Sequence, residues 1–412
     1  MPTATESMRS RINPALGTFL LLLALNLLNY VDRYILSGEV LPIQHEFHVT
    51  DQQMGALGTA FFLVYMLAAP ATGWLGDRFR RKPLIVSGAI LWSLATLAAL
   101  WVHSYFTLYL RQALVGIGEA TFGIFAPAVL SDFYPERERN RVLSVFYVAI
   151  PVGAALGYLA GGQIGARWGW RTPFFVCALP GIVAAGLYAW FGGEPARGAA
   201  DRIRPSLDRT TVQGIFRNPA FLTATFGLAM LTFAMGGIAW WMPEFLRRSA
   251  GLTMGTASIV VGATTVADGI VGTLAGGWIA QIWLRSNPRA LYLLSAWSVA
   301  LTLPCGILLF FGPRAWAIPS LAAAEFFLFL NTGPLNTAIV NSVAAPVRAT
   351  AISINLFCIH FFGDTFSPQI IGAISDHTRL SVGLGATLVT LAISCTILFC
   401  GARYAPRLDA AD

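Results

Sequence analysis

The sequence has very few charged residues. Only 11% of its 412 residues are Asp, Glu, Lys or Arg, whereas 56% are hydrophobic. Soluble domains carry about 25% charged residues. This deficit excludes an ordinary soluble protein and indicates a chain embedded in a lipid bilayer.

Cysteine and lysine are also scarce. The five cysteines all lie in apolar stretches, without the spacing of a disulfide framework or of metal ligands, so we expect neither disulfides, nor a metal, nor another cofactor. Lys82 is the only lysine, and the chain has no Asn-x-Ser/Thr sequon. Residues 1–13 are polar and do not resemble a cleaved signal peptide. These features fit a protein of the bacterial inner membrane.

What the chain has in abundance is long apolar runs. A helix needs about 20 apolar residues to cross a bilayer, and twelve runs are long enough. The predicted spans are 16–38, 54–75, 84–103, 105–130, 141–166, 172–192, 219–246, 254–284, 289–312, 315–341, 350–375 and 380–403.

The positive charges are distributed unequally between the two sides of these spans. Nineteen of the 27 Lys and Arg residues fall on the side that holds both termini, and six fall on the other side. Cytoplasmic loops carry such an excess, so we expect both termini in the cytoplasm. The net charge of +7 is therefore read as a topology signal, and no nucleic-acid partner is expected.

The two halves of the chain resemble each other. Residues 73–76 (GWLG) match 277–280 (GWIA), and residues 135–146 match 346–357, both at an offset just over 200. A polar segment rich in Gly, Pro and Arg separates the halves. The predicted fold is all-α, with twelve transmembrane helices in two six-helix bundles around a central cavity, as in major facilitator transporters. The predicted bundles are 1–191 and 217–412, and the cytoplasmic linker is 192–216.

The stretch from Asn26 to Gly38 carries Asp32 and Arg33 inside the first apolar run. A charged residue at that depth costs about 2.5–3.5 kcal/mol on insertion scales, so it usually faces a cavity or a partner. Asn26, Tyr30 and Arg33 share one helical stripe, and we expect them to bind substrate, with Arg33 holding an anionic head group.

Asp32 is rotated about 100° from Arg33, so both cannot face the cavity centre. We expect Asp32 to turn into its own bundle and pair with Arg111, which lies in the fourth span together with Glu119. An Asp32–Arg111–Glu119 chain would pass protons inward. Alternatively, Arg111 extends to the membrane surface and Glu119 occupies a packed site.

A polar motif closes the second span. Residues 73–82 read GWLGDRFRRK, and Asp77 would meet a helix N-terminus or an arginine of the other half, which closes the cytoplasmic side. A solvated turn is the simpler alternative. The predicted cytoplasmic gate comprises Gly73, Asp77, Arg78, Arg81, Arg139 and Arg348.

More ionisable residues lie in the second half. His360 and Asp364 are four apart in the eleventh span and share a helix face, as a substrate site or as a packing pair. Asp268 and Glu325 are further acids inside spans, for which transport and packing roles both stay open.

Several motifs together resemble the spinster family of the major facilitator superfamily. They are NYVDR from residue 29, GWLGDRFRRK, LVGIGEA from 114, FYVAIPVGAALGY from 146 and GDTFSPQIIGAISD from 363. The resemblance implies transport of lysolipids, sphingosine-1-phosphate and similar amphipaths, in some members with protons. Leu330 and Asn331 stand where animal members carry a Gly-Glu pair.

We therefore expect a secondary active transporter that works by alternating access as a monomer, coupled to protons. Its substrate would be a small lysolipid or a sphingosine-phosphate-like amphipath. Proton-coupled symport of small carboxylates is the alternative, because anion–cation symporters also carry an Asp-Arg pair in the first helix. A receptor or scramblase on the same scaffold would not accumulate substrate. An intramembrane protease is disfavoured, since Asp77 and Asp364 lie in different halves.

Overall fold

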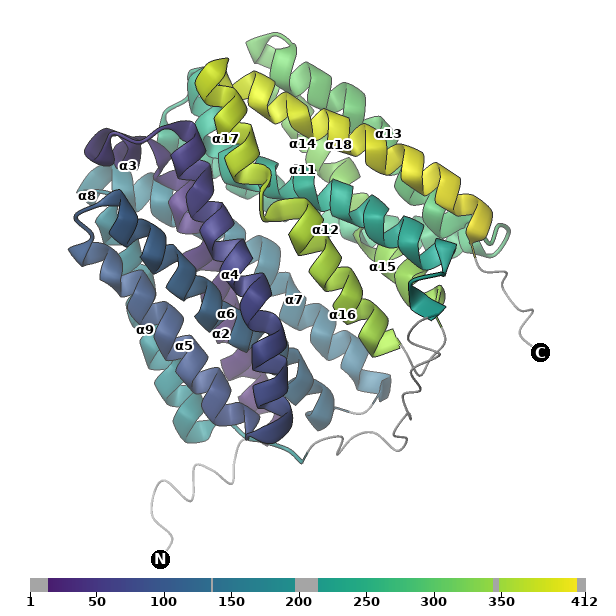
Figure 1. Ribbon diagram of the computed structural model, residues 1–412, viewed down its shortest axis with the longest axis horizontal. Coiled ribbons are helices and arrows are strands. Elements are labelled where there is room, and N and C mark those ends of the chain that lie inside the picture. The colour runs from purple at the N-terminus through teal and green to yellow at the C-terminus, as the bar shows by residue number, and fades with distance from the viewer. Residues whose placement is uncertain (1–13, 135, 197–213, 344–347, 406–412) are drawn as a thin grey trace, which may run out of the picture. The chain divides into compact units, whose positions relative to one another are not determined.

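The computed structural model describes residues 14–134, 136–196, 214–343 and 348–405 (Figure 1). These residues form helices and short connections, and no strand occurs among them. Eleven of their helical segments are long and apolar enough to cross a membrane. The prediction of an all-helical membrane protein is therefore confirmed.

The chain divides into two compact units. The first comprises Met1–Pro42 and Ala60–Arg204, and the second comprises Ile43–Thr59 and Pro205–Asp412. The segment from Ile43 to Thr59, which we had assigned to the first bundle, belongs to the second unit. Most of the predicted linker, residues 197–213, lies outside the described residues.

The first unit is built from antiparallel membrane helices joined by short turns. Its helices are α2 (Pro14–Ile35), η1 (Leu36–Gly38), the larger part of α4 (Asp51–Arg78), α5 (Arg81–Leu97), η2 (Ala98–Trp101), α6 (Tyr105–Phe133), α7 (Glu136–Leu159), the π-helix η3 (Ala160–Gly165), α8 (Ala166–Trp168) and α9 (Arg171–Phe191). The short helix α3 (Val40–Phe47) and the beginning of α4 include residues of the second unit.

Glycines bring α2 and α7 together in this unit. A methyl group on Gly153 would lie 2.8 Å from the carbonyl oxygen of Leu27, and one on Gly157 would overlap α2 as well. Small residues permit this close approach between membrane helices. The glycine-rich motif of the fifth span therefore fixes the position of the helix that carries Asp32 and Arg33.

The second unit contains the remaining helices. They are α11 (Pro219–Ala250), α12 (Met254–Leu284), α13 (Ala290–Phe311), η4 (Arg314–Trp316), α14 (Ala317–Leu330), α15 (Thr332–Asn341), α16 (Arg348–Ile359), η6 (His360–Asp364), α17 (Ser367–His377), α18 (Leu380–Gly401) and η7 (Ala402–Tyr404).

The predicted span at 350–375 is helical but interrupted. The chain leaves α16 through the π-helix η6, in which Gly363 has non-helical angles (φ −103°, ψ −107°), and continues as α17. The bend between α16 and α17 is visible in Figure 1. A methyl group on Gly363 would meet the carbonyl oxygen of Ala229 at 2.9 Å, so α11 passes close to this bend. The interruption explains why eleven rather than twelve uninterrupted spans are found.

Candidate functional site

Arg33 and Glu119 form an ion pair in the interior of the first unit. Nη2 of Arg33 lies 2.6 Å from Oε2 of Glu119, and Nε donates to the same oxygen over 3.0 Å. Glu119 is 1% exposed. Burial of two charges is tolerated because each compensates the other and the bonds are short. The pair joins the last turn of α2 to the middle of α6.

Three aromatic rings surround the guanidinium of Arg33. Its Cζ lies 4.6 Å from the ring centroid of Tyr30, 4.9 Å from that of Phe61 and 5.6 Å from that of Tyr65. Such contacts stabilise a cation by about 0.5–2 kcal/mol each, more where water is excluded. Arg33 therefore lies in an aromatic box that accepts a positive charge.

Asp32 points to a different neighbour. Its Oδ2 accepts a hydrogen bond from Oγ1 of Thr96 on α5 over 3.4 Å. Its Oδ1 is buried and has no hydrogen-bond partner among the described residues. The 100° rotation between Asp32 and Arg33 predicted this divergence.

Arg111 does not pair with Asp32 as we expected. Its Nε donates to the carbonyl oxygen of Ala95 over 3.0 Å, and its Nη1 donates to Oε1 of Gln112 over 2.9 Å. Its guanidinium also covers the ring of Phe174 at 4.4 Å. Among the described residues no ion pair involves Arg111, and the acid of α6 bonds Arg33 instead.

Asn26 has a structural contact. Its Nδ2 donates to the carbonyl oxygen of Phe146 on α7 over 2.8 Å, and the residue is 4% exposed. A buried amide that makes such a hydrogen bond links the two helices, here α2 and α7. Of the predicted α2 stripe, Arg33 forms the ion pair and Tyr30 lies against its guanidinium, whereas Asn26 faces α7.

His360 and Asp364 meet in the second unit, as their spacing predicted. Nδ1 of His360 lies 2.9 Å from Oδ1 of Asp364, at the interrupted helix. Four phenylalanines lie within three residues of this pair in the chain, make ring contacts through Phe361 and are at least one third exposed, namely Phe357, Phe361, Phe362 and Phe366. A polar pair thus borders an apolar, accessible aromatic surface.

The second-span motif makes contacts within the first unit. Nη1 of Arg81 lies 2.5 Å from Oδ2 of Asp132, and the carboxylate of Glu194 accepts from the backbone N–H of Arg81 over 2.6 Å and from Nε of Arg80 over 2.9 Å. Arg78 covers the ring of Trp74 at 3.9 Å. The polar partners, Asp132 and Glu194, were missed by sequence reasoning, which looked for partners in the other half.

For the other four predicted gate residues, only the backbone belongs to the described part of the structure. Helix α4 contains Gly73 and Asp77, α7 contains Arg139, and α16 begins at Arg348. Their side chains lie outside the described part of the structure. The cytoplasmic gate therefore stays a prediction.

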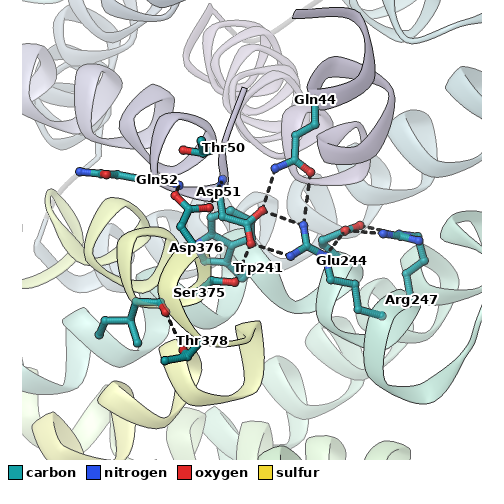
Figure 2. Close-up of polar contacts among 12 residues, drawn as sticks. Gln44, Thr50, Asp51, Gln52, Trp241, Glu244, Arg247, Ser375, Asp376 and Thr378 are labelled. Atoms are coloured by element: carbon teal, nitrogen blue, oxygen red, sulfur yellow. Dashed lines mark hydrogen bonds and ion pairs between the residues drawn. The ribbon is translucent and has the colours of Figure 1, made fainter. Parts of the chain in front are cut away.

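Sequence reasoning also missed a polar cluster in the second unit, around Asp51 (Figure 2). The carboxylate of Asp51 accepts from Nη1 and Nη2 of Arg248 over 2.5 and 2.7 Å, and from Oγ of Ser375 over 2.6 Å. Arg248 also donates to Glu244, which binds Arg247 as well. The cluster joins the beginning of α4 to the ends of α11 and α17.

The same cluster caps the N-terminus of α4. The carboxylate of Asp376 accepts the backbone N–H groups of Asp51 and Gln52 over 2.8 and 2.9 Å (Figure 2). A carboxylate stabilises a helix N-terminus by satisfying free donors and by its charge. Nearby, Nε1 of Trp241 donates to the carbonyl oxygen of Pro368 over 2.9 Å. The only sequence signal was the density of polar residues just outside the spans.

The fold and the buried charges are those of a membrane transporter. Residues 22–368 match the family model of the Major Facilitator Superfamily. A solved bacterial homologue of the human lysosomal transporter Spinster superposes with a TM-score of 0.85 at 23% identity, covering 97% of this chain and 99% of its own. A D-xylose–proton symporter has the same fold, with a TM-score of 0.76 at 16% identity, covering 96% and 98%.

The chain belongs to the spinster family of this superfamily. It is 34% identical to spinster homolog 1 of Xenopus tropicalis over 386 residues, which cover 87% of this chain and 73% of that protein. It is 31% identical to a sphingosine-1-phosphate transporter of Xenopus tropicalis, covering 91% and 76%. These relatives are transporters, which confirms the expectation that the chain is not an enzyme.

Proposed function

We propose that this transporter works by alternating access and couples protons to the movement of an anionic amphipath, either a lysolipid or a sphingosine-phosphate-like molecule. The observation that carries the proposal is the Arg33–Glu119 pair in its aromatic box. One of the relatives is a sphingosine-1-phosphate transporter, which supports the substrate class.

Arg33 retains the capacity to bind an anion. The bonds to Glu119 and Asn29 use Nε and Nη2, and no hydrogen bond of Nη1 occurs among the described residues. Its side chain is 15% exposed. A phosphate or carboxylate would accept from the free edge of the guanidinium.

Glu119 links this anion to a proton. The carboxylate of Glu119 and an anionic substrate compete for the same guanidinium. When Glu119 takes up a proton, Arg33 loses its internal counter-charge, and its positive charge becomes available to the substrate. Proton binding and anion binding therefore favour each other.

Asp32 is the second proton acceptor in this proposal. It is buried, one of its carboxylate oxygens is without a partner among the described residues, and Arg111 interacts electrostatically with both Asp32 and Glu119. The three residues assigned to proton coupling are therefore kept, with Glu119 bonded to Arg33 instead of to Arg111.

The apolar part of the substrate requires an apolar surface. The partly exposed phenylalanines beside His360 and Asp364 offer one, with a polar pair at its edge for a hydroxyl or amine. We assign His360 and Asp364 to substrate contacts on this basis.

Orientation and location complete the proposal. The excess of Lys and Arg on one side favours cytoplasmic termini, and the lack of an Asn-x-Ser/Thr sequon together with the single lysine fits a bacterial inner membrane. The gate of the second-span motif, with Asp77 as its acid, would then close the cytoplasmic side of a functional monomer.

The test is uptake into proteoliposomes. The purified protein is reconstituted, a pH gradient is imposed, and accumulation of a labelled lysolipid or sphingosine-1-phosphate is followed. We expect Asp32→Asn and Glu119→Gln to abolish the response to the gradient, and Arg33→Ala to abolish binding of the anion. Arg167→Ala is the matched control, because Arg167 is exposed. Coupled uptake that survives both acid substitutions would overturn proton coupling, and competition by an aldonate but not by a lysolipid would overturn the substrate class.

A further inference from the structure

Two acids inside the second unit have no role in the mechanism above. Asp268 lies near the middle of α12, and Glu325 lies in α14 and is 6% exposed. Both belong to segments apolar enough to cross the membrane. An ionisable side chain at that depth is costly unless it has a partner or a ligand.

A threonine three residues before Asp268 on α12 bonds Glu325. Oγ1 of Thr265 lies 3.2 Å from Oε1 of Glu325. Thr265 and Asp268 are three apart on α12 and so share the face that meets α14. Asp268 is close enough to interact electrostatically with Glu325. Further along the same face, a methyl group on Gly276 would overlap the carbonyl oxygen of Leu330, so the two helices are in direct backbone contact.

Each acid has an oxygen that is not accounted for. Oε2 of Glu325 and Oδ2 of Asp268 are buried without a hydrogen-bond partner among the described residues. A buried oxygen in this state costs free energy comparable to a lost hydrogen bond. The two acids differ in access, because Glu325 is sealed whereas Asp268 is half-buried.

The helices around the pair supply no counter-charge. In the spans of α11 to α15, the remaining charged side chains are Glu244, Arg247 and Arg248. Both arginines bind Glu244 near the end of α11, and Arg248 also binds Asp51. The other titratable groups are Tyr292, whose hydroxyl donates to Ala220, and Cys305. Arg314, in η4 before the beginning of α14, is exposed and lies eleven residues before Glu325 in the chain.

A proton satisfies these conditions better than a metal ion does. A metal such as Mg²⁺ or Ca²⁺ takes about six or more oxygen ligands, and no group of three or more potential ligand side chains occurs in the described part of the chain. One proton turns an orphaned acceptor into a donor and removes one of two like charges.

We propose that Asp268, Glu325 and Thr265 form a proton-binding site in the second unit, with Glu325 as the resident acid and Asp268 as its exchange partner. The carboxyl O–H of Glu325 breaks as the O–H of Asp268 forms, so a proton moves from the sealed acid to the accessible one, and charge is conserved. The site lies in the second unit, whereas Arg33 and Glu119 lie in the first, and binding of its proton does not require substrate.

The test measures proton binding without transport. Infrared difference spectra of the purified full-length protein between acidic and alkaline pH record the carbonyl stretch of protonated carboxyls, and a pH-indicator dye counts the protons released. We expect Glu325→Gln to remove one buried carboxyl band and to release one proton fewer per chain. We expect Asp268→Asn to keep that band but to slow its hydrogen–deuterium exchange at least several-fold. Glu138→Gln, at an exposed position, is the control.

Three results would overturn this site. The first is an unchanged band and proton count in Glu325→Gln. The second is loss of the band on addition of Na⁺ at constant pH in the unmodified protein, which would mean a metal-ion site. If Glu325→Gln does not fold, Glu325→Asp replaces it, and an unshifted titration of the band in that variant is the third. Because no substrate is present, failure of the Arg33–Glu119 coupling leaves each of these readouts intact.

Discussion

Replacing Glu119 by Gln tests the buried pair directly. Removing one partner of a buried ion pair costs about 3–5 kcal/mol, because the other charge remains buried and uncompensated. The amide oxygen of Gln still accepts one hydrogen bond from Arg33, which returns about 1 kcal/mol. The three aromatic rings stay in place. We therefore expect Glu119→Gln to lower the free energy of unfolding by roughly 2–4 kcal/mol.

This loss is measurable by thermal unfolding in detergent, followed by tryptophan fluorescence. For a unit of about 150–250 residues, 1 kcal/mol shifts Tm by about 2–4 °C, so a decrease of roughly 4–16 °C is expected. The double variant with Arg33→Gln removes both charges and should be less destabilised than the two single variants combined, with a coupling of about 2 kcal/mol. Additive effects, or a Glu119→Gln variant as stable as the Glu138→Gln control, would refute the reasoning.

Three further comparisons, made with five substitutions, test the geometry. Arg248→Gln should lower Tm more than Arg247→Gln, because Arg248 binds two carboxylates and Arg247 binds one. Gly276→Ala should reduce folded yield and Tm sharply, whereas Gly277→Ala should be neutral or slightly stabilising, because nothing lies within 4 Å of a methyl group there. Burial raises the pKa of Glu39, which lies between spans, to about 9. The carboxyl group of Glu39 loses its proton near pH 4.5 in the unfolded chain and near pH 9 in the folded chain. The free energy of unfolding should therefore fall by up to about 1.4 kcal/mol per pH unit as the pH rises between these values. Glu39→Gln should flatten this decline.

Each of these has a clear contrary outcome. Equal Tm values for the two arginine variants would remove the special position of Arg248 in the cluster around Asp51. Equal behaviour of the two glycine variants would contradict the close contact of α12 with α14. A Tm of the unmodified protein that is constant or rises between pH 5 and 9, relative to Glu39→Gln, would show that Glu39 is not buried as a neutral acid.

The apolar spans were predictable because length and hydropathy depend only on local sequence. The runs at 105–130 and 254–284 agree closely with α6 and α12. The interruption at Gly363 lies just before Pro368, which has no backbone N–H to continue the helix, whereas the close passage of α11 is a tertiary contact that hydropathy does not give. The assignment of residues 43–59 to the second unit is tertiary in the same sense.

The sequence predicted which residues belong to the candidate site better than it predicted which of them bond to each other. Helical rotation separated Asp32 from Arg33, and the spacing of His360 and Asp364 gave their contact. The choice of Glu119 as the partner of Arg33 depends on how far a long guanidinium side chain reaches between helices. Sequence spacing gives the depth of a residue in the membrane but not this reach.

The bend between α16 and α17 divides one predicted span into two helices that need not move together. A continuous helix moves as a rod, so a tilt at one end displaces the other end. With its hydrogen-bond ladder broken at Gly363, this segment has a joint instead. The α17 part is anchored through Pro368 and Asp376, so we expect a change of angle at the bend to displace α16 rather than α17. His360 and Asp364 are the first and last residues of η6, so a ligand bound to both would act directly on the angle between α16 and α17.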